Sequence, residues 1–214
     1  MKKAVIFDLD GTLINSLPDI ARAMNQALIH AGLAPYAEER YNHFVGDGVL
    51  NLAARVAGEH PEKIPVLLDF YMPYYQAHSR EKSHVYPGIR ESLSALAAAG
   101  LRLCVLSNKD QTDVENVITH YFAGTRFDVI RGRQDGFPIK PEPDGALMIA
   151  EALCLSPADI WYVGDTDTDM RCGQNAGMET IGVEWGFRDR AELLQTGACH
   201  IVSAPEEMTA LILR

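Results

Sequence analysis

Residues 4–13 read AVIFDLDGTL, and this stretch decides the fold. The apolar run AVIF predicts a short strand that is buried on both faces, as a parallel sheet requires. Asp8 and Asp10 follow the run at once, and Gly11 lets the chain turn away from the sheet. Because ligands bind beyond the carboxyl ends of the strands in such sheets, we expect both carboxylates in an active-site crevice.

The composition indicates a globular protein without a basic face. The chain has 214 residues, of which 47% are hydrophobic and 22% charged, which suits one large domain or a domain with an insertion. Its formal net charge of -10 argues against nucleic acid and membrane surfaces as partners. No apolar run is long enough for a secretory signal or a membrane span. We therefore expect a cytoplasmic protein, either a monomer or a homodimer.

The cysteines suggest neither a zinc site nor a redox motif. Cys104, Cys154, Cys172 and Cys199 are far apart in the sequence and form no CxxC pair. We predict buried or partly buried free thiols.

Helix and strand patterns alternate in the second part of the chain. The spacing of apolar residues predicts helices over 89–99, 114–121, 145–153 and 167–176, and strands over 101–106, 127–130, 160–163, 180–183 and 200–202. This alternation implies a parallel sheet covered on both faces, that is, a doubly wound α/β fold.

The segment between the first strand and this alternation has a different pattern. Helices are predicted over 17–31, 37–44, 49–57 and 64–79, and no strand is predicted between Ile14 and His84. Aromatic residues 70, 71, 74 and 75 have helical spacing and are expected to pack in a core. We predict an α/β core catalytic domain formed by 1–14 and 86–214, with a helical cap domain, 15–85, inserted after the first strand.

Polar residues recur at the predicted strand ends and in the turns near them. Each could have an ordinary structural role in a turn, a helix cap, a helix N-terminus or the solvated surface. Their joint occurrence in order along one sheet edge favours a single site. The set comprises Asp8, Asp10, Ser107, Asn108, Lys140, Asp165 and Asp169.

These residue types suit phosphoryl transfer. Several carboxylates in one crevice repel one another unless a cation is present, and oxygen ligands without His or Cys favour Mg²⁺ over zinc. Lys140 offers positive charge to a phosphate, and the Ser107 hydroxyl and nearby backbone N–H groups offer hydrogen bonds. A carboxylate can attack phosphorus while a second one transfers protons. Asp8 and Asp10 fit these two roles.

Four stretches carry a family resemblance. They are DLDGTL at 8–13, LSNK at 106–109, KPEP at 140–143 and GDTDTD at 164–169. Together they resemble the signature motifs of the phosphatases of the haloacid dehalogenase superfamily. The resemblance implies a helical cap that closes over the site and reads the substrate.

The resemblance also implies roles for single residues. Asp8 would be the nucleophile, Asp10 the general acid and base, and Lys140 the group that stabilises charge. The phosphate of the substrate would bind at Ser107, Asn108 and Lys140. Mg²⁺ would bind at Asp8, Asp10 and Asp165, with Asp10 offering its backbone carbonyl, and Asp169 would orient metal-bound waters or Lys140.

The substrate is less clearly indicated than the chemistry. The stretches NSLPDIARAMNQAL at 15–28 and FVGDGVLNLAARV at 44–56 resemble phosphoglycolate phosphatases, although many relatives have an acidic residue at the position of Asn15. We therefore expect hydrolysis of a small phosphorylated metabolite, with 2-phosphoglycolate as the first candidate. Arg22, Arg40 and Arg55 could each bind a substrate carboxylate or form solvated helix surface. The alternatives are a β-phosphoglucomutase-like mutase, a pyrophosphatase of the superfamily and a catalytically silent binding module.

Overall fold

The computed structural model describes residues 2–214, and the chain divides into two compact units. The first unit combines the N-terminal segment up to Ile14 with Val85–Arg214, and the second is Asn15–His84. No helix within residues 2–214 has the length and apolar character needed to cross a membrane.

The first unit is built on a parallel sheet. Among the described residues six strands form it, in the order β5-β4-β1-β6-β7-β8. Their bounds are β1 Ala4–Phe7, β4 Arg102–Asp110, β5 Val129–Arg133, β6 Ile160–Gly164, β7 Glu179–Val183 and β8 His200–Val202. The chain first builds the sheet to one side of β1 and then to the other, so the strand order reverses there. In sheets of this kind that reversal marks the ligand crevice.

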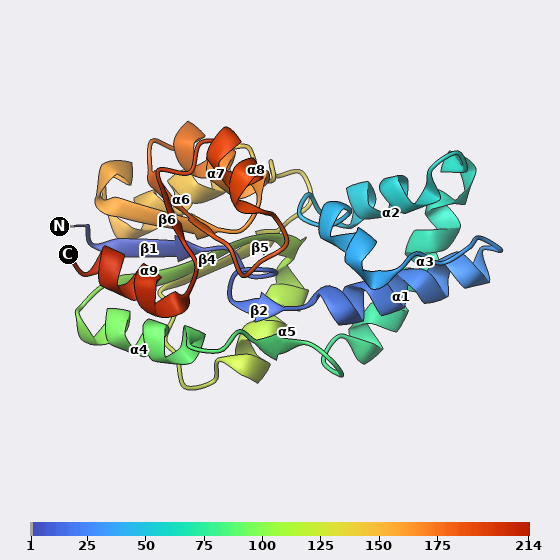
Figure 1. The fold of residues 1–214 in the computed structure, drawn as a ribbon, viewed down its shortest axis with the longest axis horizontal. Coiled ribbons are helices and arrows are strands. Elements are labelled where there is room, and N and C mark those ends of the chain that lie inside the picture. Colours follow the sequence, from blue (N-terminus) through green and yellow to red (C-terminus); the bar gives the residue numbers. More distant parts are fainter. Residues whose placement is uncertain (1) are drawn as a thin grey trace. The chain divides into compact units, whose positions relative to one another are not determined.

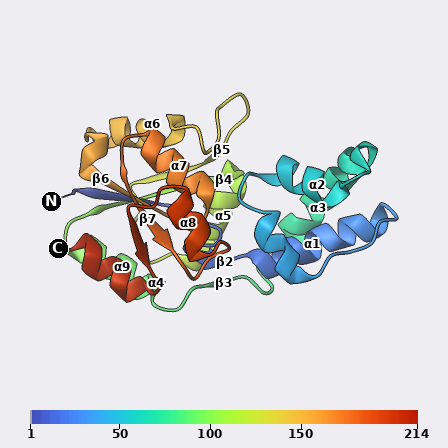
Figure 2. The ribbon, with the colours of Figure 1, turned by 45° about the horizontal axis from the view of Figure 1, so that its top comes forward.

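Helices cover both faces of the sheet, which confirms the predicted doubly wound fold (Figures 1 and 2). One face packs against α4 (Ile89–Ala98), α5 (Gln111–Tyr121) and α9 (Pro205–Ile212). The other packs against α6 (Asp144–Leu153) and α7 (Asp167–Asn175), and α8 (Arg190–Gln195) contacts β7 and β8. All four residues of β1 are fully buried, because β1 lies centrally between these two cores.

Some elements of this unit depart from the sequence prediction. β4 continues to Asp110, and its register against β5 shifts between Leu106 and Asp110, so the polar residues of this stretch lie inside the strand. Helices α8 and α9 were not predicted; α8 has only six residues, which is too short to show clear periodicity. The cysteines are free, as predicted. Cys104 and Cys172 are buried, whereas Cys154, at the exposed end of α6, and Cys199 are exposed, so the predicted burial is wrong for two of the four.

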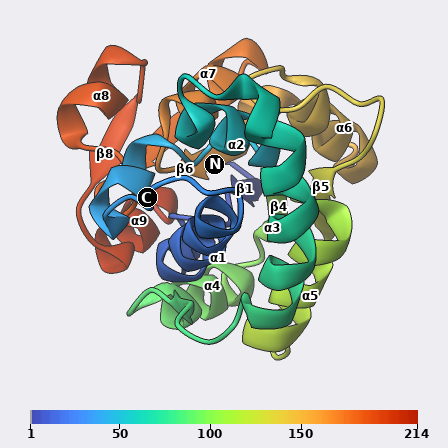
Figure 3. The ribbon, with the colours of Figure 1, turned by 90° about the vertical axis from the view of Figure 1, so that its right-hand side faces the viewer.

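The second unit is helical and contains α1 (Leu17–His30), α2 (Val49–Ala57) and α3 (Ile64–His78), seen in Figure 3. The short 3-10 helices η1 (Glu38–His43) and η2 (Pro61–Lys63) connect them. A helical segment was predicted over 37–44, and the structure confirms one of the 3-10 type there. η1 buries one side chain, Tyr41, and lacks the apolar stripe of a longer helix. Tyr71 and Tyr75 stack at 5.3 Å in the core of this unit, which confirms a packing role for both.

Two very short strands lie where the chain passes between the units. β2 (Ile14–Asn15) and β3 (His84–Val85) pair as a separate two-stranded sheet. The prediction of no strand between Ile14 and His84 is therefore wrong at both ends. Strands of two residues are too short to show an alternating pattern.

A buried carboxylate joins the two ends of the helical unit. Asp19 lies in the first turn of α1 with 1% of its surface exposed. It accepts hydrogen bonds from the backbone N–H of Lys82 at 3.0 Å and of Ser83 at 2.8 Å, and from the Ser83 hydroxyl at 2.7 Å. The segment after α3 is thereby fixed to the start of α1.

Candidate active site

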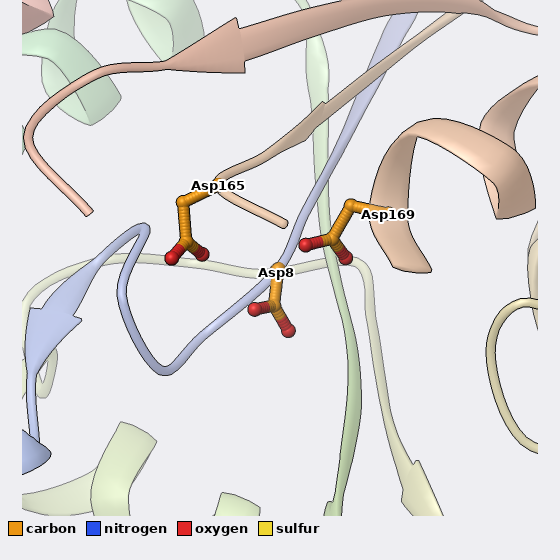
Figure 4. A group of neighbouring side chains, drawn as sticks. All are labelled: Asp8, Asp165 and Asp169. Carbon is orange, nitrogen blue, oxygen red and sulfur yellow. The ribbon is translucent and has the colours of Figure 1, made fainter. Parts of the chain in front are cut away.

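Three of the predicted aspartates meet at the carboxyl ends of the central strands. Asp8 follows β1, Asp165 follows β6, and Asp169 lies in the first turn of α7. One carboxylate oxygen from each lies within 4.8 Å of the others, and all three side chains are buried (Figure 4). We call these three residues the aspartate cluster.

The local fold explains why the aspartate cluster forms. β1 and β6 are paired neighbours, with Phe7 opposite Val163, so the residues that follow both strands emerge side by side. α7 begins almost directly after β6 with a capping box. In it, Oδ2 of Asp169 accepts hydrogen bonds from the backbone N–H of Thr166 at 3.1 Å and from its hydroxyl at 2.7 Å. This fixes the Asp169 carboxylate and leaves its Oδ1 facing the cluster.

Lys140 is the cation that joins two members of the aspartate cluster. Its Nζ donates to Oδ1 of Asp8 at 2.6 Å, to Oδ1 of Asp169 at 2.8 Å and to the carbonyl of Leu106 at 3.2 Å. The Asn108 side chain forms two hydrogen bonds with the backbone of Lys140. It donates to the carbonyl at 3.0 Å and accepts from the N–H at 2.9 Å. Asn108, predicted to bind substrate, is thus placed where it positions Lys140.

Ser107 and Asp10 lie on the same edge but in different surroundings. Ser107 is 5% exposed, and its hydroxyl accepts a hydrogen bond from the Lys109 N–H at 3.2 Å. The carboxylate of Asp10 is not in the aspartate cluster. Its two oxygens accept from Nζ of Lys109 at 3.0 and 2.8 Å. Lys109 belongs to the LSNK stretch, but no role was predicted for it from the sequence.

Burial and electrostatic repulsion shift pKa values in the aspartate cluster. Burial raises the pKa of Asp8 well above its usual value; Lys140 offsets this in part, while Asp169 and Asp165 add repulsion. Burial, followed by repulsion from Asp169, raises the pKa of Asp165 to about 7. Burial lowers the pKa of Lys140, but attraction to Asp169 and Asp8 outweighs burial and raises it. Lys140 therefore stays charged, while the raised pKa values of Asp8 and Asp165 indicate that one ammonium is not enough to favour ionisation of all three carboxylates.

The donor set of the aspartate cluster fits a hard divalent cation. It offers carboxylate oxygens from three buried residues and no nitrogen or sulfur ligand. Mg²⁺ binds through one or two carboxylates together with waters and substrate phosphate. A divalent cation bound here would relieve the mutual repulsion that raises the pKa values of Asp8 and Asp165.

The three arginines that could read a substrate carboxylate differ in their contacts. Arg22 pairs with Asp19 at 3.1 Å and with Glu81. Arg55 pairs with Asp47 and donates to a backbone carbonyl of the same unit. Arg40 lies over the Phe44 ring, with the guanidinium carbon 5.9 Å from its centroid. A substrate carboxylate at Arg22 or Arg55 would compete with these acids.

Comparison with known protein families indicates the same class of protein as the fold and the site. A family model described as haloacid dehalogenase-like hydrolase matches residues 5–183. The chain belongs to this family, and the predicted class of enzyme, a hydrolase, is confirmed.

Individual relatives show which members of the family this chain resembles. The phosphoglycolate phosphatase of Chromobacterium violaceum is 33% identical over 197 residues, which cover 89% of each chain. That of Psychrobacter arcticus is 32% identical over 204 residues, covering 91% of this chain and 88% of the relative. The crystal structure of a predicted phosphoglycolate phosphatase from Haemophilus somnus superimposes with a TM-score of 0.92 at 27% identity, covering 99% of this chain and 98% of that one. These matches confirm the resemblance to phosphoglycolate phosphatase-like members of the superfamily.

Proposed function

We propose that this protein is a Mg²⁺-dependent phosphatase that hydrolyses a small phosphomonoester through an aspartyl-phosphate on Asp8. The observation that carries the proposal is the buried contact of Lys140 with both Asp8 and Asp169 inside the aspartate cluster. Phosphoryl transfer requires a carboxylate nucleophile, a fixed positive charge and a set of oxygens that binds a cation, all in one crevice. Asp165 and Asp8, with the backbone carbonyl of Asp10, would hold the metal.

The first half of the reaction forms the covalent intermediate. A carboxylate oxygen of Asp8 attacks phosphorus, and the bond from phosphorus to the leaving oxygen breaks. Asp10 donates its proton to that oxygen, so the substrate leaves as an alcohol. Lys140 and the Ser107 hydroxyl stabilise the charge on the phosphoryl oxygens. When bound, Mg²⁺ offsets further negative charge on the transferred group.

The second half returns the enzyme to its starting state. Asp10, now ionised, accepts a proton from water as the water oxygen attacks phosphorus. The bond between phosphorus and the Asp8 oxygen breaks, and inorganic phosphate leaves. Lys109, which donates to both oxygens of Asp10, positions this side chain for the two proton transfers.

The relatives support 2-phosphoglycolate as the first substrate to test. We also propose that the helical unit, Asn15–His84, serves as the cap that selects the substrate. Within that unit Arg40 is the first arginine to test for binding a substrate carboxylate, because, among residues 2–214, no acidic side chain forms an ion pair with it.

The test is phosphate release from a panel of phosphorylated metabolites, with 2-phosphoglycolate and a hexose phosphate in the panel. We expect release that requires Mg²⁺ and is lost in Asp8→Asn. An acid quench of the reaction with labelled substrate should trap labelled protein in the wild type and none in the variant. Isomerised hexose phosphate with conserved total ester would instead indicate a mutase. Absence of phosphate release from every compound would refute the proposal.

A further inference from the structure

Two separate segments contact Asp165: the segment that follows β7 and the loop that follows β1, which we call the first loop. The Phe187 N–H donates to Oδ2 of Asp165 at 2.8 Å. From the first loop, the Thr12 hydroxyl donates to Oδ1 of the same carboxylate at 2.9 Å. Each oxygen of Asp165 therefore has a donor from a different part of the chain, and the plane of the carboxylate is fixed by the pair.

Two glycines make room for this arrangement. A Cβ at Gly11, whose φ is +94°, would lie 2.2 Å from Oδ2 of Asp165. A Cβ at Gly186 would lie 2.2 Å from the Cβ of Asp165. Both distances are far below any van der Waals contact, so only glycine at these two positions allows the first loop and the segment after β7 to lie this close to Asp165.

Trp185 links the segment after β7 to the loop after β1. Its indole Nε1 donates to the carbonyl of Thr12 at 3.0 Å, from a position 173 residues further along the chain. Trp185, Gly186 and Phe187 thus clamp the first loop and Asp165 together. Sequence reasoning missed this segment because its contacts with Asp165 are made by backbone atoms, which leave no residue-type signal.

We propose that Trp185–Gly186–Phe187 is the element that positions Asp165 for the metal, so that the indole hydrogen bond contributes to metal affinity and not to the chemical step. This inference rests on the proposed function, because it needs Asp165 to be a metal ligand. Residues that orient ligands in this way typically change metal affinity by about 10- to 100-fold when they are removed. Trp185 acts one step further from the carboxylate, so we expect a smaller change for it.

The experiment compares the only two tryptophans of the chain. Trp185→Phe removes the indole N–H that holds Thr12. Trp161→Phe is the matched control, since Nε1 of Trp161 is buried without a hydrogen-bond partner among residues 2–214. Mg²⁺ affinity is measured by calorimetry. We expect Trp185→Phe to weaken it about 3- to 10-fold and Trp161→Phe to leave it within about 2-fold.

Three further measurements separate positioning from a purely structural role. At saturating Mg²⁺ the Trp185→Phe enzyme should recover the kcat of the wild type. Because Mg²⁺ also stabilises the folded state, the far-UV circular dichroism of the variant is compared with that of the wild type in EDTA. We expect the same spectrum, and an unfolded variant in EDTA would indicate a purely structural role. In Trp161→Phe the single remaining indole is Trp185, and its emission should change as Mg²⁺ is added. Emission that is insensitive to Mg²⁺ would overturn the inference.

The outcomes also separate this inference from the proposed function. Unchanged Mg²⁺ affinity in Trp185→Phe, with Mg²⁺-dependent phosphatase activity intact in the wild type, would reject the positioning role and leave the function standing. A wild type that binds no Mg²⁺ and releases no phosphate would reject both.

Discussion

The two units of the chain differ in how their buried charged side chains are paired. In the α/β unit, the aspartate cluster and Lys140 are buried together at strand ends. Within residues 15–84, Asp19 is the one charged side chain that is fully buried, and its partners are donors from the same unit. Unbalanced buried charge is costly and is typical of reacting sites, whereas balanced charge is typical of structural ones. This difference between the units supports the proposal that the α/β unit carries the chemistry.

The largest effect should come from the nucleophile. We expect Asp8→Asn to lower kcat about 10⁴-fold or more, because no carboxylate oxygen remains to attack phosphorus. Steady-state phosphate release at saturating Mg²⁺ measures the change. Asp159→Asn is the control, because Asp159 forms a surface pair with Lys3 and should give the rate of the wild type. Full activity in Asp8→Asn would assign the nucleophile elsewhere.

The second effect tests whether the buried charges of the α/β unit depend on one another. Lys140→Met leaves Asp8 and Asp169 buried without their ammonium, so the free energy of unfolding in EDTA should fall by about 3 kcal/mol. Mg²⁺ should restore part of this loss. Urea unfolding in EDTA and in MgCl₂ measures both. Lys3→Met, at the surface, is expected to change the same quantity by less than about 1 kcal/mol. An equal loss of unfolding free energy in both Lys variants would contradict the view that the buried charges of the α/β unit depend on one another.

The third effect is a pH dependence of metal binding. The raised pKa of Asp165, about 7, means that the metal-free folded protein holds a proton that the unfolded chain releases. That contribution to stability is present at low pH and is lost as pH rises through about 7. Mg²⁺ competes with this proton, so the stabilisation by Mg²⁺ should be about 2 kcal/mol larger near pH 8 than near pH 5.5. Thermal unfolding with and without Mg²⁺ at both pH values measures it, and stabilisation independent of pH would argue against Asp165 as a ligand.

The smallest effect belongs to the helical unit. Asp19→Ala leaves the N–H groups of Lys82 and Ser83 without their acceptor and should lower stability by about 1 to 2 kcal/mol. Hydrogen exchange of these two amides should accelerate while Mg²⁺ affinity is unchanged. Asp69→Ala, at an exposed position of α3, is the matched control and should leave exchange as in the wild type. A change in Mg²⁺ affinity in Asp19→Ala would show that the two units are coupled.

The sequence predicted those features that residue type and spacing encode. The apolar run of β1 and the alternation after residue 87 are sufficient for the parallel sheet. Polar residues at the strand ends and in the turns near them include all three members of the aspartate cluster, but they also include Asp10, whose carboxylate lies outside it. The clamp on Asp165 and the pairing of Lys109 with Asp10 were not predicted, because they depend on which atoms come within hydrogen-bond distance after folding. Short elements such as α8 and β2 were missed because they span too few residues to show a period.

The pairing of β2 with β3 has a consequence for how such a protein can change over time. The chain leaves the α/β unit through one of these strands and returns through the other, so the helical insertion starts and finishes at adjacent points. A replacement insertion of any length with similarly close ends could be joined at the same two points without stretching the sheet. The α/β unit and the inserted segment can therefore change independently during evolution. Recombination at this junction is a physically simple route to new members of the family.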